Sequence, residues 1–254
     1  MTITDRTKAT KATTRVPMDP TRKTAFVGGA FYVITFAASI PALFLIGPVL
    51  NNPDYIVSSG TDTRVLWGCF LDLVNALACI GSAVALFSVV KRQHEGFALG
   101  FVTTRLVEVV FIVIGVVSLL SVVSLRQDLA GAAGTDSASL VTVGQSLVAV
   151  RDWTFLLGPT FMAGMNALML ATLMYRSRLV PRIIPTLGLI GAPLLLTSTT
   201  ATMFGINHPG SAWSTIAVAP IFVWELSLGI YLVVKGFKPS PITAGIAGAG
   251  TPPA

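Results

Sequence analysis

Ionisable and amide side chains lie inside long apolar stretches of this 254-residue sequence, where they could bind a ligand or carry a proton. A charged side chain at the centre of a membrane-spanning helix costs about 2.5 to 3.5 kcal/mol on insertion scales, so such residues face one another or a wet cavity. A mid-span tryptophan joins them, because an interfacial anchor has no use there. The candidate ligand or ion site residues are Asp72, Asn75, Arg105, Glu108, Asp152, Asn166, Trp224 and Glu225.

Four of these residues are expected at one depth. Arg105 and Glu108 are three positions apart, so a helix places both on one face, where a charged pair is geometrically natural. At about 1.5 Å per residue, Arg105, Asn166 and Glu225 lie, like Glu108, about 12 to 16 Å from the same edge of the apolar layer. We therefore expect a polar chamber between the second, third, fourth and sixth apolar runs, in which Arg105 compensates Glu108 and Glu225.

The sequence contains no recognised catalytic or metal-binding motif. HExxH, GxSxG, P-loop and GxGxxG patterns are all missing from it. His94 and His208 fall in loops predicted on opposite sides of the membrane, so they cannot share a metal ion. Cys69 and Cys79 are ten residues apart in one apolar run and are interpreted as small apolar fillers. We expect no metal and no cofactor, and the sequence favours a role other than catalysis.

Six apolar runs must position the polar residues. The chain is 53% hydrophobic and only 11% charged, which excludes a water-soluble globular domain. One crossing of a bilayer needs about 20 apolar helical residues. We predict an all-α polytopic membrane protein with one domain, residues 24–238, and six transmembrane helices. These helices are expected at about residues 24–50, 65–90, 97–125, 145–175, 183–204 and 213–235.

The fourth run is too long for an upright crossing. Its 31 positions would reach about 46 Å as a straight helix. We therefore expect an interfacial turn at its start, or a tilt, or a bend near Gly158 and Pro159.

Basic residues indicate the orientation. One side carries thirteen of them, which are Arg6, Lys8, Lys11, Arg15, Arg22, Lys23, Lys91, Arg92, Arg176, Arg178, Arg182, Lys235 and Lys238. The opposite loops hold only Arg64 and Arg126. By the positive-inside rule both termini are cytoplasmic, and residues 1–23 and 239–254 are expected to be disordered cytoplasmic tails. Basic residues scattered in this way do not form a nucleic-acid-binding stripe.

Several short motifs give the chain a family resemblance. They include Lys91-Arg92-Gln93, Arg105 with Glu108, Asp152-Trp153-Thr154-Phe155, Asn166-Ala167-Leu168, and Trp224 to Gly229. With them the chain resembles, over roughly residues 20 to 240, a bacterial membrane protein family frequent in actinomycetes, the domain-of-unknown-function 4386 group. The resemblance implies a multi-pass protein of the bacterial plasma membrane without an assigned activity. Asp72 stands where relatives carry Glu, and Arg151 where they carry His.

Three classes of function stay open. The first is a protein that binds or moves a small amphipathic molecule, an ion or a proton through the chamber. The second is a structural or accessory subunit whose buried charges lock helix packing, since a buried ion pair is no proof of activity. The third is a membrane-embedded enzyme acting on a lipid or isoprenoid. The expected partners are membrane lipid and a small-molecule ligand, with no nucleic acid, and a homo-oligomer is left open.

Overall fold

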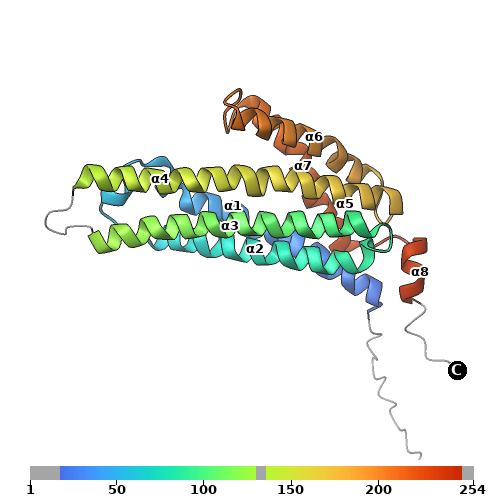
Figure 1. The fold of residues 1–254 in the computed structure, drawn as a ribbon. Coiled ribbons are helices and arrows are strands. Elements are labelled where there is room, and N and C mark those ends of the chain that lie inside the picture. The colour runs from blue at the N-terminus through green and yellow to red at the C-terminus, as the bar shows by residue number, and fades with distance from the viewer. Residues whose placement is uncertain (1–17, 130–135, 248–254) are drawn as a thin grey trace, which may run out of the picture.

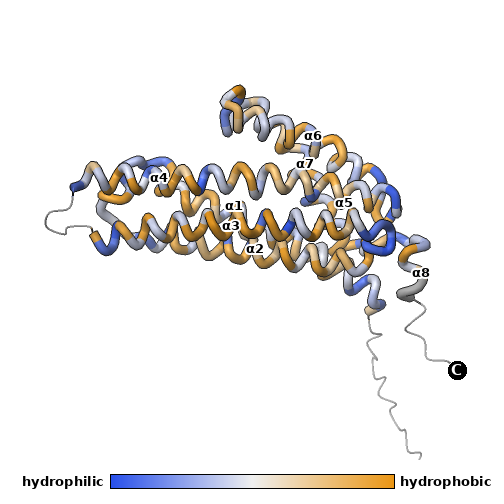
Figure 2. Tube along the Cα trace, viewed as in Figure 1, coloured by the Kyte–Doolittle hydropathy of each residue, from blue (hydrophilic) through white to orange (hydrophobic). Residues whose placement is uncertain are grey.

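The chain folds into six long helices, as the apolar runs predict. The computed structural model describes residues 18–129 and 136–247, which are helical apart from short connections (Figure 1). Six segments are long and apolar enough to cross a membrane, which confirms the all-α, six-helix fold class. Figure 2 shows their apolar middles and the hydrophilic residues near their ends. The segments are α1 (Pro20–Asn51), α2 (Thr63–Val90), α3 (Glu95–Leu129), Ser137–Ser177, α6 (Ile183–Met203) and α7 (Ala212–Val234).

The six crossings form a ring. Each packs closely on the one before it, and α7 packs on α1, which closes the circuit. We call the end of the bundle where α1 begins and α7 ends the near end, and the opposite end the far end. The positive-inside rule predicts that the near end is cytoplasmic.

The ring is tightly closed at its near end. A Cβ atom on Gly29 would lie 2.7 Å from the carbonyl oxygen of Gly229, so only glycine permits this approach of α1 and α7. The Arg22 guanidinium then donates hydrogen bonds to the last carbonyls of α7, at 2.9 Å to Leu232 and 2.7 Å to Val233. The last carbonyls of a helix lack their full set of N–H partners, and the Arg22 guanidinium supplies donors to them, so Arg22 caps α7 and ties the first crossing to the last.

The fourth crossing is one continuous helix with a widened middle. It consists of α4 (Ser137–Phe155), a π-helical segment η2 (Leu156–Met162) and α5 (Ala163–Ser177). Pro159 has no N–H to donate, and the Thr160 hydroxyl donates a hydrogen bond of 3.1 Å to the Phe155 carbonyl. The expected irregularity at Gly158 and Pro159 is therefore a π segment. No interfacial turn occurs at the start, because the described helix already begins at Ser137.

The ring is looser between α4 and α6 at the far end. The close neighbours of α6 are α7, α5 and the π segment. In Figure 1, α6 and α7 lean away from α4 toward the turn that joins them. The fourth crossing therefore packs on α6 only through its near half.

Two short helices lie outside the ring. The 3-10 helix η1 (Tyr55–Val57) connects α1 to α2 at the far end. At the near end, α8 (Pro241–Ala247) lies within residues 239–254, for which a disordered tail was expected. The chain before α8 is held to the α5–α6 turn by a hydrogen bond of 2.7 Å from the Lys238 N–H to the Leu179 carbonyl. Residues 1–17 and 248–254 of the predicted tails lie outside the described residues.

Candidate functional site

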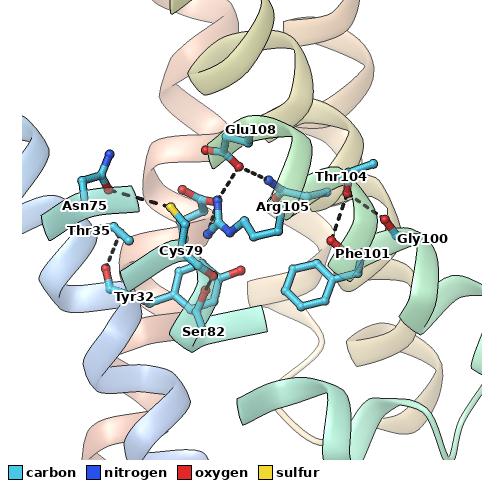
Figure 3. Close-up of polar contacts among 12 residues, drawn as sticks. Tyr32, Thr35, Asn75, Cys79, Ser82, Gly100, Phe101, Thr104, Arg105 and Glu108 are labelled. Atoms are coloured by element: carbon cyan, nitrogen blue, oxygen red, sulfur yellow. Dashed lines mark hydrogen bonds and ion pairs between the residues drawn. The ribbon is translucent and has the colours of Figure 1, made fainter. Parts of the chain in front are cut away.

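Three charged residues predicted at one depth meet inside the ring. Arg105 donates from Nη1 to Glu108 Oε2 at 2.9 Å and from Nη2 to Glu225 Oε1 at 3.4 Å (Figure 3). Asn166, on α5, donates from Nδ2 to the same Glu108 oxygen at 2.7 Å. The Arg105 guanidinium also lies over the Tyr32 ring, 5.0 Å from its centroid. Residues of α1, α3 and α7 thus contact one guanidinium group, and Asn166 of α5 binds its partner Glu108.

These charges border a cavity of about 330 Å³ inside the ring. Arg105, Glu108 and Glu225 are among its lining residues. Its walls are mostly apolar and include phenylalanines from α1, α3, α4 and α7. We call this cavity the chamber. A cavity with apolar walls and a few convergent polar groups is the usual form of a small-molecule site.

A second charged pair lines the chamber on its opposite side. Arg151 Nη2 of α4 lies 3.8 Å from Asp72 Oδ2 of α2, and both residues are buried. Asn75 lines the chamber one turn from Asp72 and accepts a weak hydrogen bond, 3.8 Å long, from the Cys79 thiol. Cys79 therefore borders the chamber, which its interpretation as an apolar filler did not include.

Several buried polar atoms near the charges have no hydrogen-bond partner among the described residues. They are Tyr32 Oη, Arg105 Nε, Asn166 Oδ1 and Trp224 Nε1. Buried polar groups are normally paired, and each unpaired one costs stability. This group of unpaired atoms therefore calls for a reason other than stability.

Not every predicted site residue reaches the chamber. Trp224 is fully buried and packs on α6, where a Cβ atom on Gly188 would lie 2.9 Å from the indole ring. Asp152 does not line the chamber but an adjoining cavity of about 370 Å³. The remaining six predicted residues either line the chamber or, like Asn166, bind a residue that does.

The adjoining cavity connects the chamber region with the far end. Its walls include Asp152 of α4, Ser198 and Thr202 of α6, and Gly210 in the α6–α7 turn. Both cavities share lining residues, among them Arg151. This cavity lies where α4 and α6 separate, so the open part of the ring is its far half.

A different charged cluster lies at the far end. Arg126 of α3 donates to the carboxylate of Asp62 and, at 2.9 and 3.0 Å, to the carbonyls of Ser58 and Gly60. Asp62 also accepts from the Tyr55 hydroxyl at 2.7 Å and from the Gln127 amide at 3.0 Å. We call these residues the far-end cluster. None of its polar atoms is among the unpaired ones, and it lines none of the cavities described above.

The titration of the far-end cluster follows from these contacts. Burial and the hydrogen bond to Asp62 raise the pKa of Tyr55 to about 12. Burial of Asp62 opposes its ionisation, but the hydrogen bonds from Gln127, Tyr55 and Arg126 outweigh burial and lower its pKa from the ordinary value. The cluster therefore holds a charged carboxylate at neutral pH.

The sequence predicted only part of the chamber lining. The chamber was expected between the second, third, fourth and sixth crossings, but α1 contributes Thr35, Phe36 and Ser39, and α6 contributes Leu195. Their residue types are ordinary for apolar helices, so no signal in the sequence marks them. Arg151 is different, because an arginine inside an apolar run is unusual and could have been paired with Asp72.

The chemistry of the chamber is that of binding and proton exchange. Its ionisable groups are carboxylates, guanidinium groups and one thiol. Within residues 18–129 and 136–247 no three His, Cys, Asp or Glu side chains are grouped so as to hold a metal ion. Carboxylates bordering a cavity can bind a cation, accept hydrogen bonds or take up a proton.

One protein family matches the chain. The family model described as a domain of unknown function, DUF4386, matches residues 27–236. No curated protein and no solved structure matches the chain.

Proposed function

We propose that this chain, which belongs to the DUF4386 family, is a membrane protein that binds a small amphipathic molecule in the chamber. The polar end of the molecule would lie at Arg105, Glu108 and Glu225, and its apolar part along the phenylalanine-lined walls. One observation carries the proposal, which is that the buried charges border a cavity of about 330 Å³ instead of being sealed by side chains. A cluster that served only to lock packing would not need this space.

The far end is the proposed route of access. The adjoining cavity extends from Arg151 to the α6–α7 turn, where α4 and α6 separate. At the near end the approach of Gly29 to Gly229 and the Arg22 cap close the ring. We place the protein in the bacterial plasma membrane with its near end and both termini in the cytoplasm, which the distribution of basic residues supports. Access would then be from outside the cell or from the outer leaflet.

Blocking the chamber tests this proposal. Ser39 lines the chamber from α1, whereas Ala37, two residues away, is exposed on the outside of the bundle. Ser39→Trp would fill the space, and Ala37→Trp adds the same side chain outside it. We expect a small molecule to co-purify with the wild type and with Ala37→Trp in native mass spectrometry, and to be reduced about tenfold or more by Ser39→Trp. Equal occupancy in all three proteins would contradict the proposal.

A structural role is the second candidate, and the Arg105 contacts favour it. Arg105 joins Glu108 of α3 to Glu225 of α7, although the helices that pack closely on α7 are α1 and α6. The double variant Arg105→Leu, Glu108→Leu separates the two roles, because replacing a buried ion pair by apolar residues is often neutral for stability. A binding site predicts a folded protein without ligand. A structural lock predicts a loss of folding with the double variant, because Glu225 then loses the cation that holds α7 to α3.

A further inference from the structure

The charged residues that line the chamber do not balance. The three carboxylates are those of Asp72, Glu108 and Glu225, and the two guanidinium groups are those of Arg105 and Arg151. An unmatched charge in the interior of a membrane protein is costly and requires a counter-charge or a proton. The chamber therefore has one carboxylate more than its own guanidinium groups can match.

Of the two carboxylates that bind Arg105, Glu225 receives the fewer and longer hydrogen bonds. Glu108 receives two short hydrogen bonds, at 2.9 Å from Arg105 and 2.7 Å from Asn166, whereas Glu225 receives one at 3.4 Å from Arg105. The Glu225 side chain is also 14% exposed, against 6% for Glu108 and 2% for Arg105. A ligand in the chamber would thus meet Glu225 before it met either of the other two.

Aromatic rings line the same chamber as Glu225. Phe36 and Phe222 line it and pack edge to face, with their ring centroids 5.0 Å apart. Phe111 lines it from α3. A fourth phenylalanine, Phe155, already has the Arg151 guanidinium over its ring at 4.8 Å, which shows that a planar cation can stack within this chamber. Aromatic faces beside a carboxylate are the usual surroundings of an organic cation in a protein.

We propose that the ligand of the chamber is a lipophilic organic cation, an ammonium group on an apolar body, whose charge pairs with Glu225. This inference rests on the proposed function and names the class of its ligand. A bare metal ion fits poorly, because hard cations require several convergent oxygen ligands and the walls here are mostly apolar. An ammonium group matches the surplus carboxylate, the phenylalanine rings accept its alkyl substituents, and the apolar walls hold its tail.

Probes that share one tail but differ in charge test this inference on the full chain in lipid nanodiscs. Binding of octyltrimethylammonium, octanoate and octanol is measured by isothermal titration calorimetry, and partitioning into empty nanodiscs is subtracted. We expect one saturable site for octyltrimethylammonium, weakened about tenfold or more by Glu225→Gln and about twofold to fivefold by Phe222→Ala. Glu225→Asp should keep most of the affinity. Glu95→Gln removes an exposed carboxylate at the start of α3 and should change nothing.

Each other result has a distinct meaning. If octanoate or octanol bound and octyltrimethylammonium did not, the cation inference would be wrong and the proposed function would stand. Binding of octyltrimethylammonium with equal affinity to the wild type and to folded Glu225→Gln would also overturn the inference. If none of the three probes bound above the empty nanodiscs, both the inference and the proposed function would be wrong. Glu225→Gln is nearly isosteric, and Phe222→Ala provides a second variant that does not alter charge.

Discussion

Arg105 and Arg126 lie on the same helix, about six turns apart, and both bind buried carboxylates in different surroundings. Arg126 donates to two carbonyls, a carboxylate and a hydroxyl, and its carboxylate partner Asp62 accepts from three side chains. Arg105 keeps an unpaired Nε and lies beside other unpaired polar atoms. The first cluster has its hydrogen bonds complete, and the second does not.

The difference separates structure from binding. A saturated buried network stabilises one arrangement of the chain and offers no group to a ligand. A cluster with unpaired polar atoms gives up stability, and here its charged residues Arg105, Glu108 and Glu225 border a cavity that a ligand could enter. The far-end cluster thus shows what a structural ion pair looks like in this protein. Compared with it, the charged group at the chamber is less completely hydrogen-bonded.

The largest effect on stability is expected at the far-end cluster. Arg126→Leu leaves the buried Asp62 carboxylate without its cation, and breaking a buried pair from one side costs about 3 to 5 kcal/mol. Thermal unfolding in detergent micelles measures this loss, and ligand binding in the folded fraction should be unchanged. Arg105→Leu should cost clearly less, because Arg105 already keeps an unpaired Nε and its carboxylate partners border a cavity. An equal loss from the two variants would remove the contrast between the clusters.

The second largest effect on stability is expected from acid, which should weaken the far-end cluster. The pKa of Asp62 is lower in the folded chain than the ordinary value of about 3.9. Its contribution is therefore complete above that ordinary value and is lost as pH falls through the lowered folded pKa. The stability gap between the wild type and Asp62→Asn should be constant from neutral pH to about pH 5 and narrow below about pH 4. A gap that does not change with pH would show that the Asp62 charge contributes nothing.

Tyr55→Phe should have a smaller effect. The Tyr55 hydroxyl donates to Asp62 at 2.7 Å and accepts from Arg126 at 3.3 Å. Removing a hydroxyl bonded to charged groups costs about 1.5 to 3 kcal/mol. The variant should therefore unfold at a lower temperature than the wild type. No change in the unfolding temperature would mean that the cluster does not depend on this hydroxyl.

Tyr32→Phe is the matched variant near the chamber, with the smallest expected effect and the opposite sign. The Tyr32 hydroxyl is buried and has no hydrogen-bond partner among the described residues. Removing it should leave the ligand-free protein equally stable or more stable by about 1 kcal/mol. Thermal unfolding of the delipidated protein measures this difference. A loss as large as that of Tyr55→Phe would place Tyr32 in a structural network after all.

Much of the fold and of the charged group at the chamber could be predicted from the sequence. Six apolar runs determined the number of crossings, and helical spacing brought Arg105 and Glu108 together, as the structure has them. The helical rise also predicted Glu225 and Asn166 at the depth of this pair, and in the structure both bond to it. These results follow from one regular quantity, the rise of a helix, which transfers from sequence to space without further information.

The rest depends on how the helices pack. The pairing of Arg126 with Asp62 brings together residues 64 positions apart, through a short loop whose course the sequence does not specify. The burial of Trp224 against Gly188 turned a candidate ligand contact into a packing residue. Whether a space remains between helices depends on side chains from all of them, so the chamber volume could not be read from any single run.

The most direct test of the account is a high-resolution structure of the full chain purified in native lipid, with attention to the chamber. The account predicts elongated density along the phenylalanine-lined walls, with its polar end within hydrogen-bond distance of Glu225. A chamber closed by side chains, with Arg105 and Glu225 as fully hydrogen-bonded as Arg126 and Asp62, would contradict it.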